Sequence, residues 1–105
     1  MSNPEIDCLG NKYWYNEKRI FHRLDGPAVE SANGDEEWYY NGNLHRIDGP
    51  AIFRKRSGRK FWYLMEKSIC CMEPTGEFDF YVDMDEIPEE MKQSLIIERL
   101  NLKNE

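Results

Sequence analysis

The chain has 105 residues, of which 40% are hydrophobic and 13% aromatic, and its formal net charge is −6 at pH 7. This length suits one compact domain, and its aromatic content suits a β-sheet. No apolar stretch approaches the roughly 20 residues that a membrane-spanning helix needs, and the polar, acidic N-terminus is unlike a signal peptide. We therefore expect a cytoplasmic protein that does not contact a membrane.

The three cysteines, Cys8, Cys70 and Cys71, cannot all pair with one another. Adjacent cysteines do not easily close a disulfide on each other, so a reducing compartment is the simplest setting. A vicinal cysteine pair could bind metal, but structural zinc needs four ligands at a recognisable spacing. We expect neither a metal site nor a cofactor.

Charge is distributed unevenly along the chain. Residues 1–72 carry 11 basic and 10 acidic side chains, a net charge of +1, whereas residues 73–105 carry 3 and 10, a net charge of −7. Phosphate binding needs a net positive surface. This balance argues against a general affinity for nucleic acid.

A repeat fills most of the chain. The pattern Gly-x-x-x-Trp-Tyr occurs three times in steps of 24 residues, with its tryptophan at Trp14, Trp38 and Trp62. The stretch His-Arg-x-Asp-Gly-Pro-Ala follows the first two copies, at residues 22–28 and 45–51. These two stretches are 23 residues apart, one residue fewer than the tryptophans. One extra residue after the second stretch makes up the difference, so Trp62 again follows Trp38 by 24 residues. Such self-similarity is typical of stacked repeats.

Each unit is predicted to run strand, turn, strand, turn. Asn41-Gly42 supplies the positive φ values of a tight hairpin turn, and Asp48-Gly49-Pro50 turns the chain again. The predicted fold is mainly β, an antiparallel meander of three stacked β-hairpin repeats with one C-terminal α-helix. The units are about 10–33, 34–57 and 58–82, between an N-terminal segment, 1–9, and an acidic C-terminal helix, 83–105.

The third unit departs from the pattern. Cys70 and Cys71 are expected at the positions of the histidine and arginine, as in a capping unit. A final strand is predicted over residues 78–82. The helix should start near Asp85, with Pro88 in its first turn, and run to about Leu102.

The apolar residues of this helix are predicted to form two stripes. They are Ile87, Met91, Leu95 and Leu102 in one, and Ile96 and Leu100 in the other. Together the stripes make a wide apolar face. We expect it to cover the open end of the sheet or to join two copies in a homodimer.

The Trp-Tyr, Asn-Gly and His-Arg-x-Asp-Gly-Pro-Ala elements of residues 10–74 resemble the MORN-like hairpin repeats common in proteins of tailed phages and giant viruses. The typical MORN unit lacks the His-Arg-x-Asp-Gly-Pro-Ala stretch, so the chain is similar to a variant of it. The resemblance implies an antiparallel, meandering sheet and, more loosely, a viral origin, and it implies little about activity. It does not extend to residues 75–105.

Two interpretations of the repeated His-Arg-x-Asp groups are open. They could supply a base, a charge clamp and an orienting acid, in an enzyme that uses His22 or His45. Alternatively each arginine pairs with the aspartate of its own unit or with turn carbonyls, and each histidine packs beside Trp or Tyr. Repetition favours this structural interpretation, because an active site needs only one constellation. The residues assigned to the framework are Trp14, Trp38, Trp62, His22, Arg23, Asp25, His45, Arg46 and Asp48.

Five basic side chains gather within residues 54–60. They are Arg54, Lys55, Arg56, Arg59 and Lys60. With the flanking rings, Phe53 and residues 61–63, they could hold phosphates and stack on bases. Against this, hairpin turns are solvated in any case, the core needs the rings, and the acidic tail could fold back onto the cations.

The segment after the repeats is acidic. Its carboxylates are Asp83, Asp85, Glu86, Glu89 and Glu90. A rigid array of carboxylates imitates phosphates and binds a basic groove on another protein. The alternative is that these acids solvate the start of the helix and stabilise its dipole.

The leading hypothesis is a non-enzymatic protein-binding module that acts through its aromatic sheet face or its acidic helix. If the virus-like resemblance holds, it would be a phage accessory protein that binds and inhibits a host factor, such as a defence or nucleic-acid-processing protein, in the infected cell. A nucleic-acid or nucleotide binder that uses residues 54–60 is the second hypothesis. An enzyme is the third.

Overall fold

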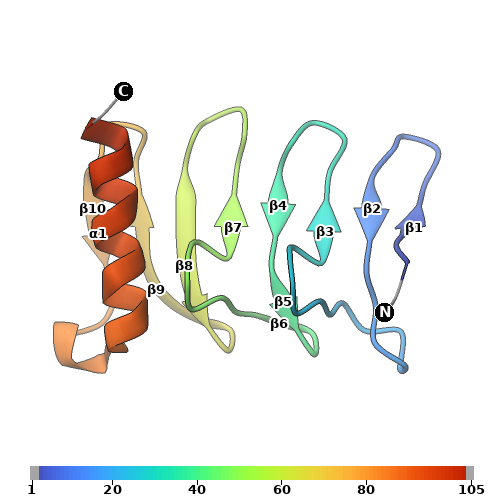
Figure 1. Ribbon diagram of the computed structural model, residues 1–105, viewed down its shortest axis with the longest axis horizontal. Coiled ribbons are helices and arrows are strands. Elements are labelled where there is room, and N and C mark those ends of the chain that lie inside the picture. Colours follow the sequence, from blue (N-terminus) through green and yellow to red (C-terminus); the bar gives the residue numbers. More distant parts are fainter. Residues whose placement is uncertain (1–2, 104–105) are drawn as a thin grey trace.

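The computed structural model describes the backbone of residues 3–103 and the side chains of residues 3–98 (Figure 1). Its strands are β1 (Glu5–Ile6), β2 (Lys12–Tyr13), β3 (Val29–Glu30), β4 (Glu36–Glu37), β5 (Tyr39–Tyr40), β6 (Asn43–Leu44), β7 (Ile52–Phe53), β8 (Lys60–Leu64), β9 (Lys67–Met72) and β10 (Phe78–Phe80). A 3-10 helix (Met84–Glu86) precedes helix α1 (Glu89–Lys103).

The described strands form one large antiparallel sheet and a separate small hairpin. The large sheet has the order β1-β2-β3-β4-β7-β8-β9-β10, and β5 pairs with β6. Figure 1 shows the hairpins side by side from the N-terminal end, with α1 at the other end. The predicted fold class, a mainly β antiparallel meander with one C-terminal helix, is confirmed.

The tight turns at the lower end of Figure 1 are determined by the residues of the turns themselves. Asn41 and Gly42 have φ values of 48° and 87°, and Met65 and Glu66 have values of 45° and 74°. Positive φ at both central residues matches the right-handed twist of the flanking strands. The second and third hairpins therefore turn in two residues each.

The sheet begins before the first repeat. Glu5 and Ile6 pair with Tyr13 and Lys12, so the segment 1–9 contributes a strand. The connecting turn depends on Asp7, whose carboxylate accepts hydrogen bonds from the backbone N–H groups of Leu9 and Asn11, each at 3.0 Å. In such an Asx turn the side chain accepts backbone hydrogen bonds, and this closes the short connection between β1 and β2.

The pairing of the third unit contains a register shift between Trp62 and Tyr63. Trp62 pairs with Cys70 and Tyr63 with Ser68, so Ile69 is the extra residue. In the second unit the N–H of His45 donates to the carbonyl of Trp38, and Tyr39 pairs with Leu44. Counted from the turn, Ile69 stands at the position of His45, whereas counted from the tryptophan Cys70 stands there.

Helix α1 packs on the sheet face that carries the tryptophans. The main core joins Trp62 and strand residues of β9 to three helix-segment residues, Ile87, Met91 and Leu95. In contrast, Ile96 is 53% exposed, so the buried face of the helix is narrower than predicted. The side chains of Leu100 and Leu102 lie outside the described residues.

The helix also starts later than predicted. Ile87 has extended backbone angles (φ −94°, ψ 121°), as expected for a residue before proline. The 3-10 helix ends there, and α1 begins at Glu89, with the carbonyl of Pro88 accepting from the N–H of Lys92 at 3.0 Å. Asp85 thus lies in the 3-10 helix and does not cap α1.

Candidate functional site

The repeated arginines stack on the repeated tryptophans. The Cζ of Arg23 lies 3.8 Å from the centroid of the Trp14 ring, and Arg23 donates to Asp25 at 3.0 Å and to the carbonyl of Pro27 at 3.1 Å. It also donates to Glu30 at 3.0 Å. This guanidinium is held by a ring, two carboxylates and a turn carbonyl.

The second unit repeats this geometry. The Cζ of Arg46 lies 3.8 Å from the Trp38 centroid, and Arg46 donates to Asp48 at 2.8 Å and to the carbonyl of Pro50 at 3.2 Å. A Cβ added at Gly49 would lie 2.6 Å from the Cζ of Arg46. A side chain at this position would therefore displace the guanidinium from its place over the Trp38 ring.

In the third unit α1 covers the tryptophan instead. Trp62 is fully buried, and its Nε1 donates to the Oγ of Ser94 at 3.1 Å. Ser94 in turn donates to the carbonyl of Met91 at 2.8 Å. The helix therefore replaces the Arg-x-Asp-Gly-Pro loop at the end of the repeat.

The histidines have backbone partners. The Nδ1 of His22 accepts from the N–H of Asn41 at 2.9 Å, and the Nδ1 of His45 accepts from the N–H of Met65 at 3.1 Å. Both rings lie beside Tyr40, at centroid distances of 5.1 and 6.1 Å. Among the described residues no carboxylate is hydrogen-bonded to either imidazole, so the His-acid pair of a general base is not assembled.

The basic cluster at residues 54–60 is largely neutralised. Arg54 pairs with Glu37 at 3.0 Å and Arg59 with Glu73 at 2.7 Å. Lys60 reaches Glu98 of α1 at 2.6 Å, so the C-terminal segment does fold back onto this hairpin. Lys55 and Arg56 are exposed and have no ion pair within the described part of the chain. Two of five cations thus remain for a phosphate.

The acidic residues 83–90 point into solvent. Exposed carboxylates here are Asp83, Asp85, Glu86, Glu89 and Glu90. Lys67 donates to Glu86 at 2.9 Å and holds the pKa of that carboxyl below its ordinary value. Tyr81 and Met84, which the sequence had not singled out, are 57% and 55% exposed beside these acids.

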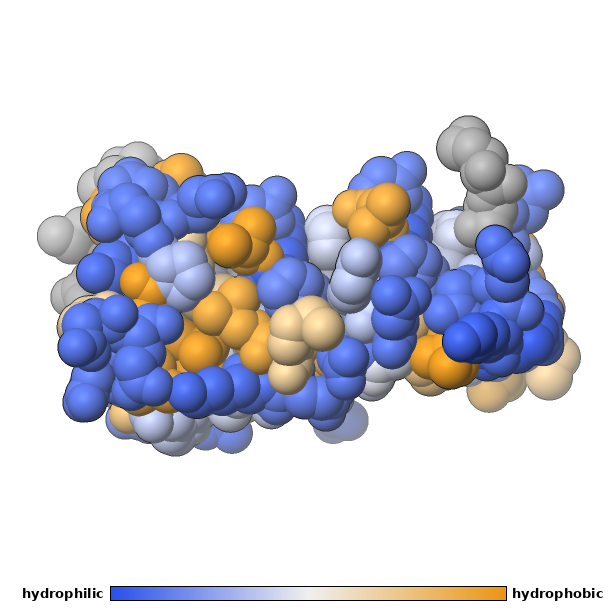
Figure 2. Space-filling model, turned by 90° about the horizontal axis from the view of Figure 1, so that it is seen from below, coloured by the Kyte–Doolittle hydropathy of each residue, from blue (hydrophilic) through white to orange (hydrophobic). Residues whose placement is uncertain are grey.

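The surface around α1 is also partly apolar. Seen from the side of the tight turns, the half of the molecule that carries α1 shows apolar surface within a hydrophilic rim (Figure 2). Mixed surfaces of this kind are typical of protein–protein contacts, whose centre is apolar and whose rim is polar.

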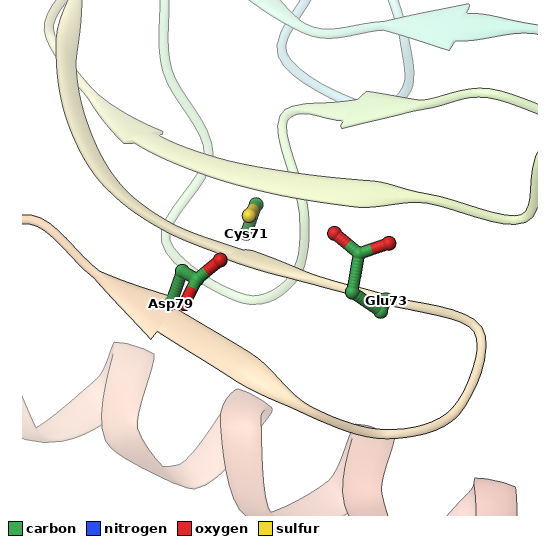
Figure 3. A group of neighbouring side chains, drawn as sticks. All are labelled: Cys71, Glu73 and Asp79. Atoms are coloured by element: carbon green, nitrogen blue, oxygen red, sulfur yellow. The ribbon is translucent and has the colours of Figure 1, made fainter.

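Cys71, Glu73 and Asp79 form a second cluster (Figure 3). Their possible ligand atoms lie within 4.8 Å of one another, because Cys71 and Asp79 are paired across β9 and β10. Arg59 donates to both oxygens of Glu73, and the Sγ of Cys71 shares a hydrogen bond with the hydroxyl of Tyr81 at 3.3 Å. A metal ion would have to displace these partners, so the cluster supports no metal site.

No protein-family model, curated protein or solved structure matches this chain. The likeness to MORN-like repeats stays a prediction from the motifs. Among the described residues, no helix has the length and apolar character needed to cross a membrane.

Proposed function

We propose that this chain is a protein-binding module that docks on a basic surface of its partner. The docking surface is its acidic end, which we define as the carboxylates of residues 83–90 together with Tyr81 and Met84. The observation that carries the proposal is the joint exposure of these five acids and two apolar side chains. Charge complementarity steers association, and a tyrosine is a frequent energetic anchor of an interface.

Rigidity supports the same surface. Ile87, in the middle of the acidic end, is only 4% exposed, and Met91 in the first turns of α1 is fully buried. These anchors fix the backbone that carries the acids. A surface held in one conformation loses less entropy on binding than a mobile tail.

The partner class follows from the charge. A protein groove that accepts an array of carboxylates is basic, and grooves of that kind bind nucleic acid. A nucleic-acid-processing or defence protein of a host cell fits this description, if the chain is viral. The neutralised state of Arg54, Arg59 and Lys60 weighs against the competing hypothesis of direct nucleic-acid binding.

An affinity capture from cell lysate, with and without nuclease, tests the proposal. We expect a protein that is retained after nuclease treatment and released by moderate salt, because exposed charges are screened. A partner that disappears with nuclease, together with a gel shift of DNA or RNA by the purified chain, would support the hairpin at residues 54–60 instead.

A further inference from the structure

A surface depression of about 210 Å³, which we call the Trp38 pocket, lies between the loops of the first two units. Its apolar lining residues are Leu24, Trp38, Tyr40 and Ile47, and its polar lining residues are Arg23, His45, Arg46 and Asp48. Tryptophan, tyrosine and arginine are the residues most enriched at the energetic centres of protein interfaces. The composition of the pocket is therefore typical of a place that receives a side chain of a partner.

The indole N–H of Trp38 lacks an acceptor. Its Nε1 is buried and has no hydrogen-bond partner among the described residues. An indole N–H can only donate, and a buried donor without an acceptor destabilises the structure that contains it. In the third unit the equivalent Nε1 of Trp62 donates to the Oγ of Ser94 in α1. The second unit therefore lacks an oxygen that the third unit has.

The apolar lining of the pocket is also uncovered. Leu24 of the first loop is equivalent to Ile47 of the second, and Tyr40 is equivalent to Leu64. Ile47 and Leu64 pack against the core that α1 completes. In contrast, Leu24 is 76% exposed and Tyr40 is 39% exposed. Helix α1 thus supplies apolar side chains and one oxygen to the third unit, and the second unit has neither.

The size of the pocket limits its occupant. The guanidinium of Arg46 lies over the face of the Trp38 ring, so a whole helix does not fit there as α1 fits on Trp62. A volume of about 210 Å³ holds one large apolar side chain, since a cavity of roughly 150 Å³ holds benzene. We propose that the Trp38 pocket receives one leucine-sized side chain of a partner protein, and that a neutral oxygen of the same segment accepts from the indole N–H.

The charges beside the pocket favour an uncharged occupant. Arg23 and Arg46 are each paired with the aspartate two residues further on, at 3.0 and 2.8 Å. A charged side chain would lose its hydration here, and both guanidinium groups already have their counter-charges. Leu24 can move aside with little loss of packing, and this opens the indole N–H to the incoming oxygen. The pocket lies on the first two units and does not rest on the function proposed for the acidic end.

A neutral peptide fragment tests the pocket. The probe is N-acetyl-leucine N-methylamide, which carries one leucine side chain between two amide groups. Titrated into the ¹⁵N-labelled wild-type chain, it should shift the indole N–H signal of Trp38 in a saturable way, with a Kd on the order of 1 mM for a ligand of this size. The signal of Trp62, whose acceptor is Ser94, should stay in place.

The glycine analogue of the probe, which lacks the side chain, should bind roughly tenfold more weakly, because it buries less apolar surface. Three results would overturn the proposal. They are the absence of a saturable shift at Trp38, equal shifts at Trp38 and Trp62, and equal binding of the two probes.

Two matched variants locate the binding. Leu24→Asp places a charge in the wall of the pocket and should abolish the shift, whereas Leu9→Asp changes a leucine that is 74% exposed outside the pocket and should leave it unchanged. Binding that survives Leu24→Asp would also overturn the proposal, and if this variant does not fold, the titration of the wild type decides. A shift at Trp38 together with a failed affinity capture would refute the function of the acidic end alone.

Discussion

The indole Nε1 of Trp62 donates to the Oγ of Ser94, and this bond lies where helix α1 takes over from the repeat. In the first two units the equivalent rings are covered by Arg23 and Arg46. The third unit has a cysteine in place of this arginine, and a cysteine is too short to cover Trp62. A helix that brings Met91, Ser94 and Leu95 to the ring closes the end of the repeat.

Ser94→Ala should destabilise the fold by about 1–3 kcal/mol, because it leaves a buried indole N–H without an acceptor. Urea denaturation followed by tryptophan fluorescence measures the change. Gln93→Ala on the exposed side of the helix is the matched control and should cost much less. Equal losses in both variants would contradict a specific contribution of the bond to Trp62.

Gly49→Ala should destabilise the fold by about 1–3 kcal/mol, because the new methyl group overlaps the guanidinium of Arg46. A double-mutant cycle with Arg46→Ala isolates this cause. In the Arg46→Ala background the substitution at Gly49 should cost clearly less. If it costs the same in both backgrounds, the glycine is needed for a reason other than the close approach of the arginine.

Only one of the three thiols should react quickly in the folded protein. Burial raises the pKa of Cys70 to about 12, and Cys71 is also buried, whereas Cys8 is exposed. A colorimetric thiol assay at pH 8 should count one fast group per chain and three in denaturant. Cys8→Ser should abolish the fast phase, and a fast phase that persists would contradict the packing of β9.

Acid should weaken the ion pair of Arg59 with Glu73. Arg59 donates to both oxygens of Glu73 and lowers the pKa of that carboxyl below 4.5. A lowered folded-state pKa adds stability above pH 4.5 that is lost as pH falls through the folded value. The difference in melting temperature between wild type and Glu73→Gln should therefore be largest at neutral pH and shrink below pH 4.5. Glu77→Gln, in the same turn, is the matched control, because Glu77 has no ion pair among the described residues.

Local patterns in the sequence predicted the meander well. Asn41-Gly42 identifies its turn because few residues adopt positive φ, and the spacing of the tryptophans gives the stacking of the units. The contacts of Arg23 and Arg46 with Asp25 and Asp48 were also accessible, since the partners are two residues apart.

Contacts between distant segments were not predictable in the same way. Lys60 and Glu98 are 38 residues apart, and their pairing depends on how α1 lies on the sheet. Strand β1 is only two residues long, so its sequence contains no alternation of apolar and polar residues that would predict a strand. The register shift between Trp62 and Tyr63 leaves no signal in the degenerate third copy. Exposure of Tyr81 and Met84 likewise depends on tertiary packing, and neither residue belongs to a motif.

The acidic end is tested most directly by the affinity of the captured partner for two matched double variants, measured by calorimetry. Asp85→Asn with Glu90→Gln removes two exposed charges from the acidic end, and Glu17→Gln with Glu77→Gln removes two exposed charges elsewhere. The account predicts an affinity about tenfold lower for the first variant, with a weaker salt dependence, and little change for the second. Equal affinities for both variants and the wild type would contradict it.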